Sequence, residues 1–319
     1  MRNRAVALVG LGLVGRSWLR VFTRVGFPTR VWDPDPEQVD AGWSSLKEDL
    51  KLARKYQGLR KAVARSQREL VTRCETLEEA VAGAAYVQEC TLGRLEAKRK
   101  LFAAMDQASG PRAILATSSA AFDLGSITSQ VASRGRCVIA HPVQLPHLLP
   151  AVEICPGPET EPAVVRRTLR FMSVIGLEPI PVRRFIVGLV ADRLRAALLR
   201  EALHIVAEEI ADAPAVDNSV KQGVGMLWAV AGPFSASAHP DDGGLREQLA
   251  EQAVAYKALW RDLANTVDVN QALIDRLARS VDGPVRGLPP EEQRIWREEM
   301  IERIRRLKHR HPLGGQVED

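Results

Sequence analysis

The sequence predicts an α/β fold in which a mostly parallel β-sheet domain is followed by an all-helical C-terminal domain, and three observations support this prediction. The chain begins with an apolar run, a glycine-rich turn and an amphipathic segment. Short apolar runs then alternate with helical periodicity as far as Val182, whereas only helical periodicity continues beyond Arg184. A chain of 319 residues is long enough for about two domains, which we place at residues 1–185 and 186–319.

The first element is a predicted dinucleotide-binding turn. Residues 5–9 are apolar and are expected to form a buried strand, and residues 17–26 are expected to form an amphipathic helix. The glycines between them have GxGxxG spacing. Gly10 permits a sharp turn, Gly12 lets the backbone approach a pyrophosphate, and Gly15 lets helix and strand pack closely. A tight turn in an unrelated α/β domain is the alternative. The residues expected to contact the cofactor are Gly10, Gly12, Leu13, Val14 and Gly15.

An acidic residue follows at the position that a dinucleotide site needs. The next predicted strand covers residues 29–33 and ends in Asp33. A carboxylate there would accept hydrogen bonds from the adenine ribose diol and would repel a 2′-phosphate. The sequence therefore predicts NAD rather than NADP as the cofactor.

The rest of the first domain continues the alternation of strands and helices. Residues 37–70 predict one or two exposed helices with a break near Gly58, and Thr76 to Glu79 fits a capping box that opens a helix over 77–82. This order predicts a mostly parallel sheet with right-handed crossovers. The other strands are expected at 70–74, 85–90, 113–117, 137–141, 151–155 and 178–182, and the other helices at 95–107, 124–132 and 163–175.

Beyond Arg184 the pattern predicts helices alone. Loops are expected at Gly232-Pro233 and at residues 240–244, which are rich in Pro, Asp and Gly. The helices are expected at 188–210, 216–222, 245–265, 271–281 and 290–310. The second domain is therefore predicted to contain no strand.

Composition indicates an ordinary soluble globular protein. Hydrophobic residues make up 46% and charged residues 26%, and 44 Lys and Arg against 39 Asp and Glu give a net charge of +5. This mild excess suits anionic substrates or solubility. The basic end, residues 303–310, could bind nucleic acid, but interleaved acidic and aliphatic residues favour a solvated helix face.

Cysteine use and the N-terminus predict a cytoplasmic protein. Cys74, Cys90, Cys137 and Cys155 form no CxxC pair and lie in or beside apolar runs, so we expect buried free thiols in a reducing compartment. A strand begins almost at the N-terminus, which leaves no room for a signal peptide, and no apolar run is long enough to span a membrane.

Polar residues just after strands are the first candidates for chemistry, because ligands of open α/β sheets bind there. His141 ends an apolar strand, and histidine can take a proton from an alcohol while hydride leaves for a nicotinamide. Glu153 lies in another apolar run, and a buried carboxylate needs a partner such as His141. The alternative for His141 is a histidine that is merely satisfied in the core.

The other candidates carry weaker signals. His204 is expected to serve packing or the surface, and His147 and His239 have no recognisable partner. No spacing of His, Cys, Asp and Glu matches a metal site, and we see no GxSxG or other nucleophile motif.

Several segments together resemble the 3-hydroxyacyl-CoA dehydrogenase family, and most closely its branch with lambda-crystallin, L-gulonate 3-dehydrogenase and carnitine dehydrogenase. The resemblance covers nearly the whole chain. It rests on residues 9–18, 87–90, 140–143, 148–153, 188–194 and 223–226.

This resemblance implies a Rossmann-type domain followed by a helical domain that forms a homodimer, with the substrate held between them. It implies that His141 and Glu153 are the catalytic dyad. Lys98 matches a lysine that contacts NAD in the family.

Departures from the family pattern fall at the substrate side. The serine that binds the substrate hydroxyl is replaced by Ala120, and Ser119 could substitute for it, although adjacent residues on an extended chain face opposite ways. Asp192 stands where an asparagine is usual, as it also does in carnitine dehydrogenases, and would suit a cation. Gln144 replaces the asparagine of His-Pro-Val-Asn, and Gly93 replaces a glutamate near the cofactor.

We therefore expect an NAD-dependent dehydrogenase that oxidises a small 3-hydroxy acid or reduces the matching 3-keto compound. The substrate-side candidates are Ser119, Gln144 and Asp192. Two alternatives stay open. One is an NAD-binding, crystallin-like protein with little turnover, favoured by Ala120, Gly93 and Gln144; the other is a repurposed ketoreductase whose substrate is, for instance, a polyketide ketone or a quaternary amine.

Overall fold

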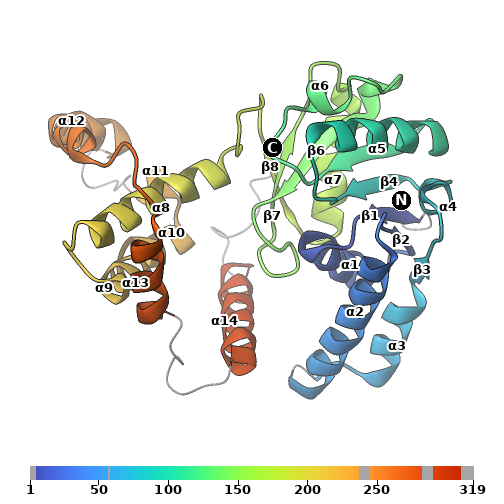
Figure 1. Ribbon diagram of the computed structural model, residues 1–319, viewed down its shortest axis with the longest axis horizontal. Helices are drawn as coiled ribbons and strands as arrows, with labels where there is room; N and C mark the ends of the chain where they lie inside the picture. Colours follow the sequence, from blue (N-terminus) through green and yellow to red (C-terminus); the bar gives the residue numbers. More distant parts are fainter. Residues whose placement is uncertain (1–4, 57, 237–243, 282–289, 310–319) are drawn as a thin grey trace. The chain divides into compact units, whose positions relative to one another are not determined.

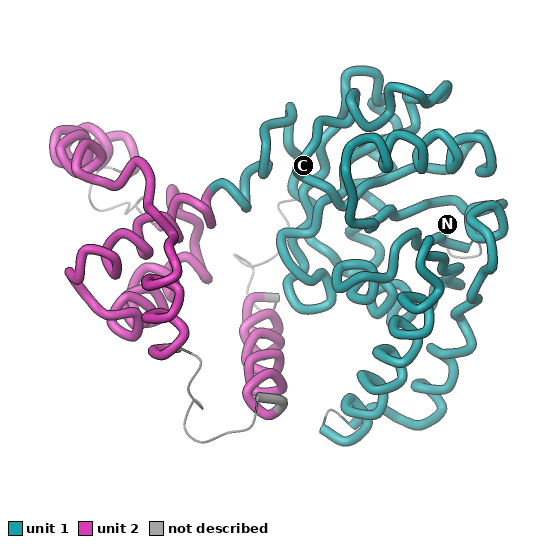
Figure 2. The backbone as a smooth tube through the Cα atoms, viewed as in Figure 1, with its two compact units in different colours: residues 1–193 teal, residues 194–319 magenta. Residues whose placement is uncertain are grey.

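The computed structural model describes residues 5–56, 58–236, 244–281 and 290–309 (Figure 1). The chain divides into two compact units, residues 1–193 and 194–319 (Figure 2). The predicted α/β architecture with a helical C-terminal part is confirmed.

Within the described residues, eight strands form one sheet in the order β3-β2-β1-β4-β5-β6-β7-β8. Neighbouring strands are parallel except β6 and β7, which are antiparallel because a loop, not a crossover helix, joins them. The mostly parallel sheet is thus confirmed. The strands are β1 (Val6–Val9), β2 (Thr29–Trp32), β3 (Val71–Arg73), β4 (Tyr86–Glu89), β5 (Ile114–Thr117), β6 (Cys137–Pro142), β7 (Ala151–Cys155) and β8 (Glu178–Pro181).

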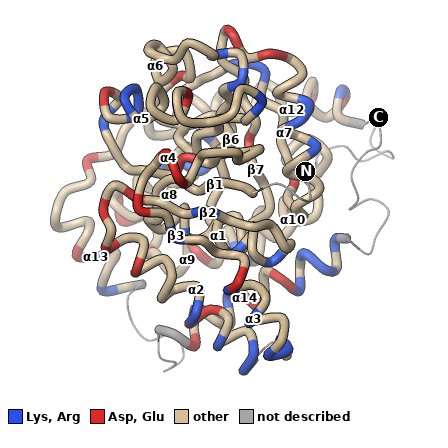
Figure 3. The backbone as a smooth tube through the Cα atoms, turned by 90° about the vertical axis from the view of Figure 1, so that its right-hand side faces the viewer, with Lys and Arg blue, Asp and Glu red and all other residues tan. Residues whose placement is uncertain are grey.

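Helices cover both faces of this sheet, and basic and acidic residues are interspersed along the chain (Figure 3). The first helix begins at Leu13, four residues earlier than the periodicity predicts, because the glycine turn passes directly into it. The helix predicted over 124–132 ends at Ile127, where the Thr128 hydroxyl donates to the carbonyl of Leu124. The helices are α1 (Leu13–Arg24), α2 (Pro36–Tyr56), α3 (Lys61–Glu69), α4 (Leu77–Val81), α5 (Leu95–Ala108), α6 (Leu124–Ile127) and α7 (Pro162–Val174).

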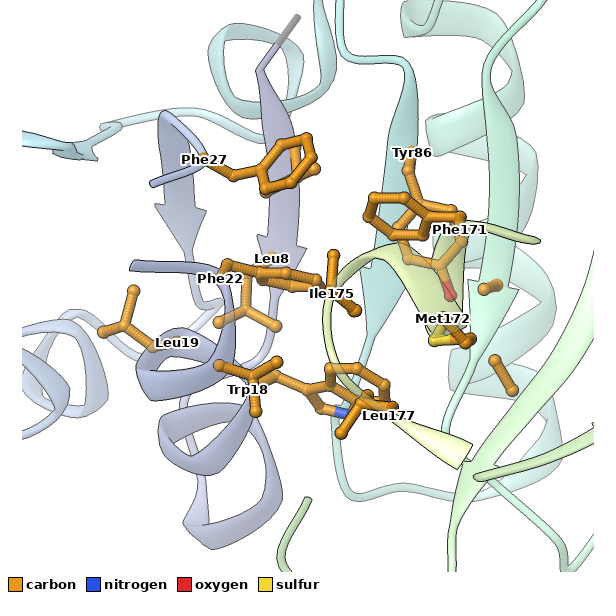
Figure 4. Close-up of a cluster of buried hydrophobic side chains, with 14 of the residues drawn as sticks. Leu8, Trp18, Leu19, Phe22, Phe27, Tyr86, Phe171, Met172, Ile175 and Leu177 are labelled. Carbon is orange, nitrogen blue, oxygen red and sulfur yellow. The ribbon is translucent and has the colours of Figure 1, made fainter. Parts of the chain in front are cut away.

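Buried side chains on the two faces of the sheet form separate clusters, as expected for parallel strands covered on both sides. On one face an aromatic group joins α1, β4 and α7 (Figure 4). Trp18 stacks on Phe22 with ring centroids 5.4 Å apart, and Tyr86 lies 4.6 Å from Phe171. This packing fixes α1 on the sheet, and with it the glycine turn at its N-terminus.

The regular elements among the described residues of the second unit are helices joined by short connections, and the chain is kinked at Gly223 between two of them. Its first helix begins at Ala191 rather than at residue 188, because Gly188 and Leu189 have positive φ angles of 78° and 46°. His239 and residues 240–243 lie outside the described residues, as does Arg310. The helices are α8 (Ala191–Ala207), which starts in the first unit, α9 (Ala213–Ser219), α10 (Gly225–Val230), α11 (Pro233–Ala236), α12 (Gly244–Asp262), α13 (Gln271–Val281) and α14 (Pro290–His309).

The basic end of α14 carries paired charges. Arg303 contacts Glu299, and Arg305 and Arg306 both contact Glu302. No helix within the described residues has the length and apolar composition needed to cross a membrane.

The four cysteines are free, but they are not all buried as predicted. Cys137 and Cys155 are buried in β6 and β7. Cys74 and Cys90 are only half-buried, because each directly follows the last residue of a strand, β3 and β4 respectively.

Candidate active site

The glycine turn lies where the strand order changes direction, at the carboxyl end of β1 between β2 and β4. Gly10 has a φ of +96°, and a Cβ on Gly15 would lie 1.9 Å from the Gly10 carbonyl oxygen. A Cβ on Gly12 would meet nothing within 4 Å. Gly10 and Gly15, which need a bare backbone, thus build the turn itself, whereas Gly12 faces open space at the N-terminus of α1, as a pyrophosphate requires.

Asp33 holds this turn as well as facing the cofactor side. Its Oδ2 accepts a hydrogen bond from the Leu11 N–H at 2.6 Å, and Oδ1 accepts one from Asp35 at 2.9 Å. A carboxylate has about four acceptor positions, so capacity remains for a ribose diol. The glycine turn, the helix N-terminus and Asp33 therefore fit NAD.

Lys98 is buried in an ion pair at the end of β4. Its Nζ donates to Glu89 Oε1 at 2.8 Å, to Glu89 Oε2 at 3.1 Å and to the Thr91 carbonyl at 2.9 Å. Three acceptors match the three N–H groups of an ammonium. Glu89 also accepts hydrogen bonds from the Thr91 backbone and the Thr117 hydroxyl. Lys98 thus anchors the segments that follow β4 and β5, beside the glycine turn, a role that the sequence did not indicate.

His141 and Glu153 face each other across the antiparallel pair β6 and β7. His141 Nδ1 lies 3.2 Å from Glu153 Oε2. Because a carboxylate only accepts, Nδ1 carries the proton and donates it, which leaves Nε2 as the basic nitrogen. The structure therefore brings together the histidine and the glutamate that the sequence pairs.

Glu153 is fully buried, yet it remains ionised. Burial is the largest influence on its pKa and raises it, but hydrogen bonds from His141, Ala191 and Val190 together outweigh burial and leave the pKa below its ordinary value. A lowered carboxyl pKa stabilises the folded chain above about pH 4.5, and this contribution is lost as the pH falls through that region.

The predicted substrate-side residues have different surroundings in the structure. Asp192, in the first turn of α8, has Oδ2 3.8 Å from His141 Nε2. The Ser119 hydroxyl instead accepts a hydrogen bond from the Ala121 N–H at 3.3 Å. Gln144 is exposed in the connection between β6 and β7. Ala120 is 8% exposed and packs in an apolar cluster.

The prediction that His147 has no recognisable partner is wrong. Its Nδ1 lies 2.6 Å from Ser17 Oγ and its Nε2 lies 2.5 Å from Arg20 Nη1, both on α1. These residues are about 130 positions apart in the chain, so no local pattern could pair them. Ser118 is another residue that the sequence did not single out for its contacts: its hydroxyl receives the Trp18 indole N–H at 3.2 Å.

A glycine turn at a helix N-terminus, a carboxylate after the next strand and a histidine–carboxylate pair share one edge of the sheet, a combination typical of NAD-dependent oxidoreductases of the Rossmann type. Within the described residues, no group of three or more His, Cys, Asp or Glu could hold a metal.

Comparison with known families identifies the class more closely. Residues 5–185 match the NAD-binding domain of 3-hydroxyacyl-CoA dehydrogenase and residues 188–273 match its C-terminal domain. The chain belongs to the 3-hydroxyacyl-CoA dehydrogenase family, whose members are NAD-dependent oxidoreductases acting on CH–OH groups.

Individual relatives agree with this assignment. Lambda-crystallin of Oryctolagus cuniculus is 31% identical over 306 residues, which cover 95% of this chain and 96% of the relative. L-carnitine dehydrogenase of Streptomyces griseus is 34% identical over 292 residues, covering 89% and 84%. A solved 5-formyl-3-hydroxy-2-methylpyridine 4-carboxylic acid 5-dehydrogenase shares the fold, with a TM-score of 0.73, 24% identity, and coverage of 98% and 99%.

Proposed function

We propose that this protein oxidises a small 3-hydroxy acid with NAD, or reduces the matching 3-keto compound, with His141 as general base and Glu153 as its orienting partner. The observation that carries the proposal is the 3.2 Å contact between His141 Nδ1 and Glu153 Oε2. The pair lies at the same sheet edge as the glycine turn, where a bound nicotinamide and a substrate hydroxyl would meet.

The residues divide the chemistry between them. NAD, when bound, accepts the hydride of the carbon that is oxidised. His141 Nε2 takes the hydroxyl proton, and the ionised Glu153 fixes the imidazole tautomer and stabilises the imidazolium that results. The cofactor pyrophosphate would be held by Gly10, Gly12, Leu13, Val14 and Gly15, and the adenine ribose by Asp33. Lys98 could donate to the cofactor only by giving up one of its hydrogen bonds to Glu89 or to the Thr91 carbonyl.

A cationic substrate such as a quaternary amine is the second candidate. The observation that favours it is the carboxylate of Asp192, 3.8 Å from the basic nitrogen of His141, since a negative charge there disfavours anions and attracts cations. The 34% identity to an L-carnitine dehydrogenase supports the same class. Ser119 and Gln144 complete the proposed substrate side.

The function is tested by NADH formation from a panel containing 3-hydroxybutyrate, 3-hydroxybutyryl-CoA, L-gulonate and L-carnitine. We expect at least one member to reduce NAD. Preference for L-carnitine that falls roughly tenfold in Asp192→Asn would identify the cationic class, because this change removes one charge and keeps the shape. Binding of NADH without turnover of any member would instead support a crystallin-like role.

Restoring the family hydroxyl separates a decayed activity from a repurposed site. One hydrogen-bond donor at a reacting oxygen contributes roughly 2.7–4 kcal/mol to transition-state stabilisation. If the ancestral substrate is handled poorly for lack of this donor, Ala120→Ser should raise kcat/KM on L-gulonate or 3-hydroxybutyryl-CoA by about a hundredfold. An unchanged rate would support a substrate of another kind.

Cofactor choice is expected to depend on the charge of Asp33. We expect NADH to bind about a hundredfold more tightly than NADPH, and Asp33→Asn to reduce this ratio about tenfold, because the amide can still accept from Leu11 but no longer repels a 2′-phosphate. Fluorescence titration with both nucleotides measures the ratio. Equal affinities in the unmodified protein would contradict the role of Asp33.

We further propose that residues 1–185 form the NAD-binding domain, that residues 186–319 form a substrate and dimerisation domain, and that the protein is a cytoplasmic homodimer. Exposed large apolar side chains of the helical unit, among them Met226, Trp228 and Phe234, support dimerisation. Free cysteines support a reducing compartment. Sedimentation equilibrium should give twice the chain mass of 35.1 kDa; a monomer at micromolar concentration would contradict the proposal.

A further inference from the structure

The connection between β6 and β7 carries the proposed dyad at its two ends. His141 lies at the end of β6 and Glu153 in β7, and residues 143–150 join them. The placement of this connection therefore affects both members of the dyad. Residues 143–150 contain no Asp, Glu, Lys or Arg, and His147 is the one residue among them with an ionisable side chain.

His147 fastens the connection to α1, the helix whose N-terminus follows the glycine turn. The backbone N–H of His147 donates to Ser17 Oγ at 3.1 Å, and its Nδ1 lies 2.6 Å from the same oxygen. Ser17 is 2% exposed, so both bonds are shielded from water. These two hydrogen bonds thus join α1 to the connection between β6 and β7.

The partner of the second ring nitrogen fixes the protonation state. His147 Nε2 lies 2.5 Å from Arg20 Nη1, and a guanidinium has donors but no acceptor. Nε2 must therefore accept, so the imidazole is neutral and its proton lies on Nδ1, which donates to Ser17. Arg20 is also paired with Asp49 on α2, which holds the guanidinium in place.

We propose that His147 is a positioning residue whose hydrogen bonds to Ser17 and Arg20 hold residues 143–150 against α1. We call this set of hydrogen bonds the tie, and we propose that it breaks when the imidazole is protonated. A proton on Nε2 would point at the Arg20 N–H and add a second positive charge beside it. Arg20 on α1 is a charged group beside the ring, and Asp49 on α2 is paired with Arg20. Histidine in an unfolded chain takes up a proton near pH 6.5, so the tie stabilises the folded loop above about pH 6.5 and is lost below it.

Hydrogen exchange of the Leu148 and Leu149 amides in the free protein tests the tie without any substrate. After correction for intrinsic rates, we expect these amides to exchange about tenfold faster at pH 5.5 than at pH 7.5, as the loss of roughly one hydrogen bond predicts. His147→Gln, which can still accept from Arg20 but does not titrate, should show no such change. In His147→Phe these two amides should exchange rapidly at both pH values. In the matched control His204→Gln they should exchange at the rates of the unmodified protein.

Two results would overturn the proposal. If the Leu148 and Leu149 amides of the unmodified protein were equally protected from exchange at pH 5.5 and pH 7.5, the pH-dependent tie would be excluded. Nitrogen-15 spectra that show the Nε2–H tautomer of His147 would exclude it as well. The catalytic part rests on the proposed function: His147→Phe should lower kcat about tenfold, with the NADH dissociation constant within twofold of normal and rescue by His147→Gln. Altered exchange with unchanged kcat would show a tie that does not position the dyad, whereas a protein with no turnover at all would refute the proposed function and leave the exchange result standing.

Discussion

Replacing His141 by alanine should lower kcat by a factor of about 10² to 10⁴, the usual contribution of a positioned general base. Glu153 cannot take its place directly, since it is buried behind the imidazole and accepts its N–H. The affinity for NADH should stay within about twofold, because the glycine turn and Asp33 follow other strands, β1 and β2. The measurement is steady-state turnover of whichever panel member is oxidised, with NADH binding followed separately.

Two further variants make this result specific. His204→Ala changes a histidine of α8 that has no part in the dyad and should leave turnover unchanged. Glu153→Gln should lower kcat less than His141→Ala does, because the neutral amide oxygen can still accept a hydrogen bond from Nδ1 but no longer stabilises an imidazolium. A His141→Ala protein that keeps more than a third of its turnover would mean that another group is the base.

Replacing Gly15 by alanine should abolish cofactor binding and destabilise the sheet unit. The added Cβ would lie 1.9 Å from the Gly10 carbonyl oxygen, which is backbone and cannot swing away. Overpacking of this kind costs about 3 kcal/mol or more, which for a unit of this size lowers Tm by roughly 10 °C. Calorimetry and NADH titration measure the two effects.

Gly12 offers the contrasting variant in the same turn. A Cβ there meets nothing within 4 Å, so Gly12→Ala should keep its normal Tm yet bind NADH at least about tenfold more weakly, because the methyl group fills the space facing the helix N-terminus. Gly110→Ala, also in open space but before β5, should change neither quantity. Unimpaired NADH binding in both Gly12→Ala and Gly15→Ala would exclude this turn as the cofactor site.

The cofactor side could be predicted from sequence because its determinants are local. The glycines and Asp33 lie within 24 consecutive positions, and each carries out a backbone task that few other residues can perform. The proximity of His141 and Glu153 was also predictable, because both occur in apolar runs where an unpaired charge or imidazole would be costly. Their directly opposed register needed the structure, since the alternation of elements does not say that β7 runs antiparallel to β6.

Contacts between distant segments were not predictable in the same way. Ser17 and Arg20 look like ordinary helix residues, and His147 lies in an uncharged loop, so nothing in either stretch reveals the other. Lys98 illustrates a different difficulty. Its match to a cofactor-binding lysine says nothing of Glu89, which takes up two of its three hydrogen bonds in the folded chain.

The two oxygens of Glu153 serve different parts of the molecule. Oε2 receives the imidazole, while Oε1 accepts the N–H groups of Val190 at 2.9 Å and Ala191 at 3.0 Å, where α8 begins. Any ligand that prefers one conformation of this first helical turn therefore also changes the free energy of the imidazole–carboxylate bond, and protonation of His141 changes the affinity for that ligand by the same factor. A single carboxylate thus couples the protonation of His141 to the conformation of the first turn of α8.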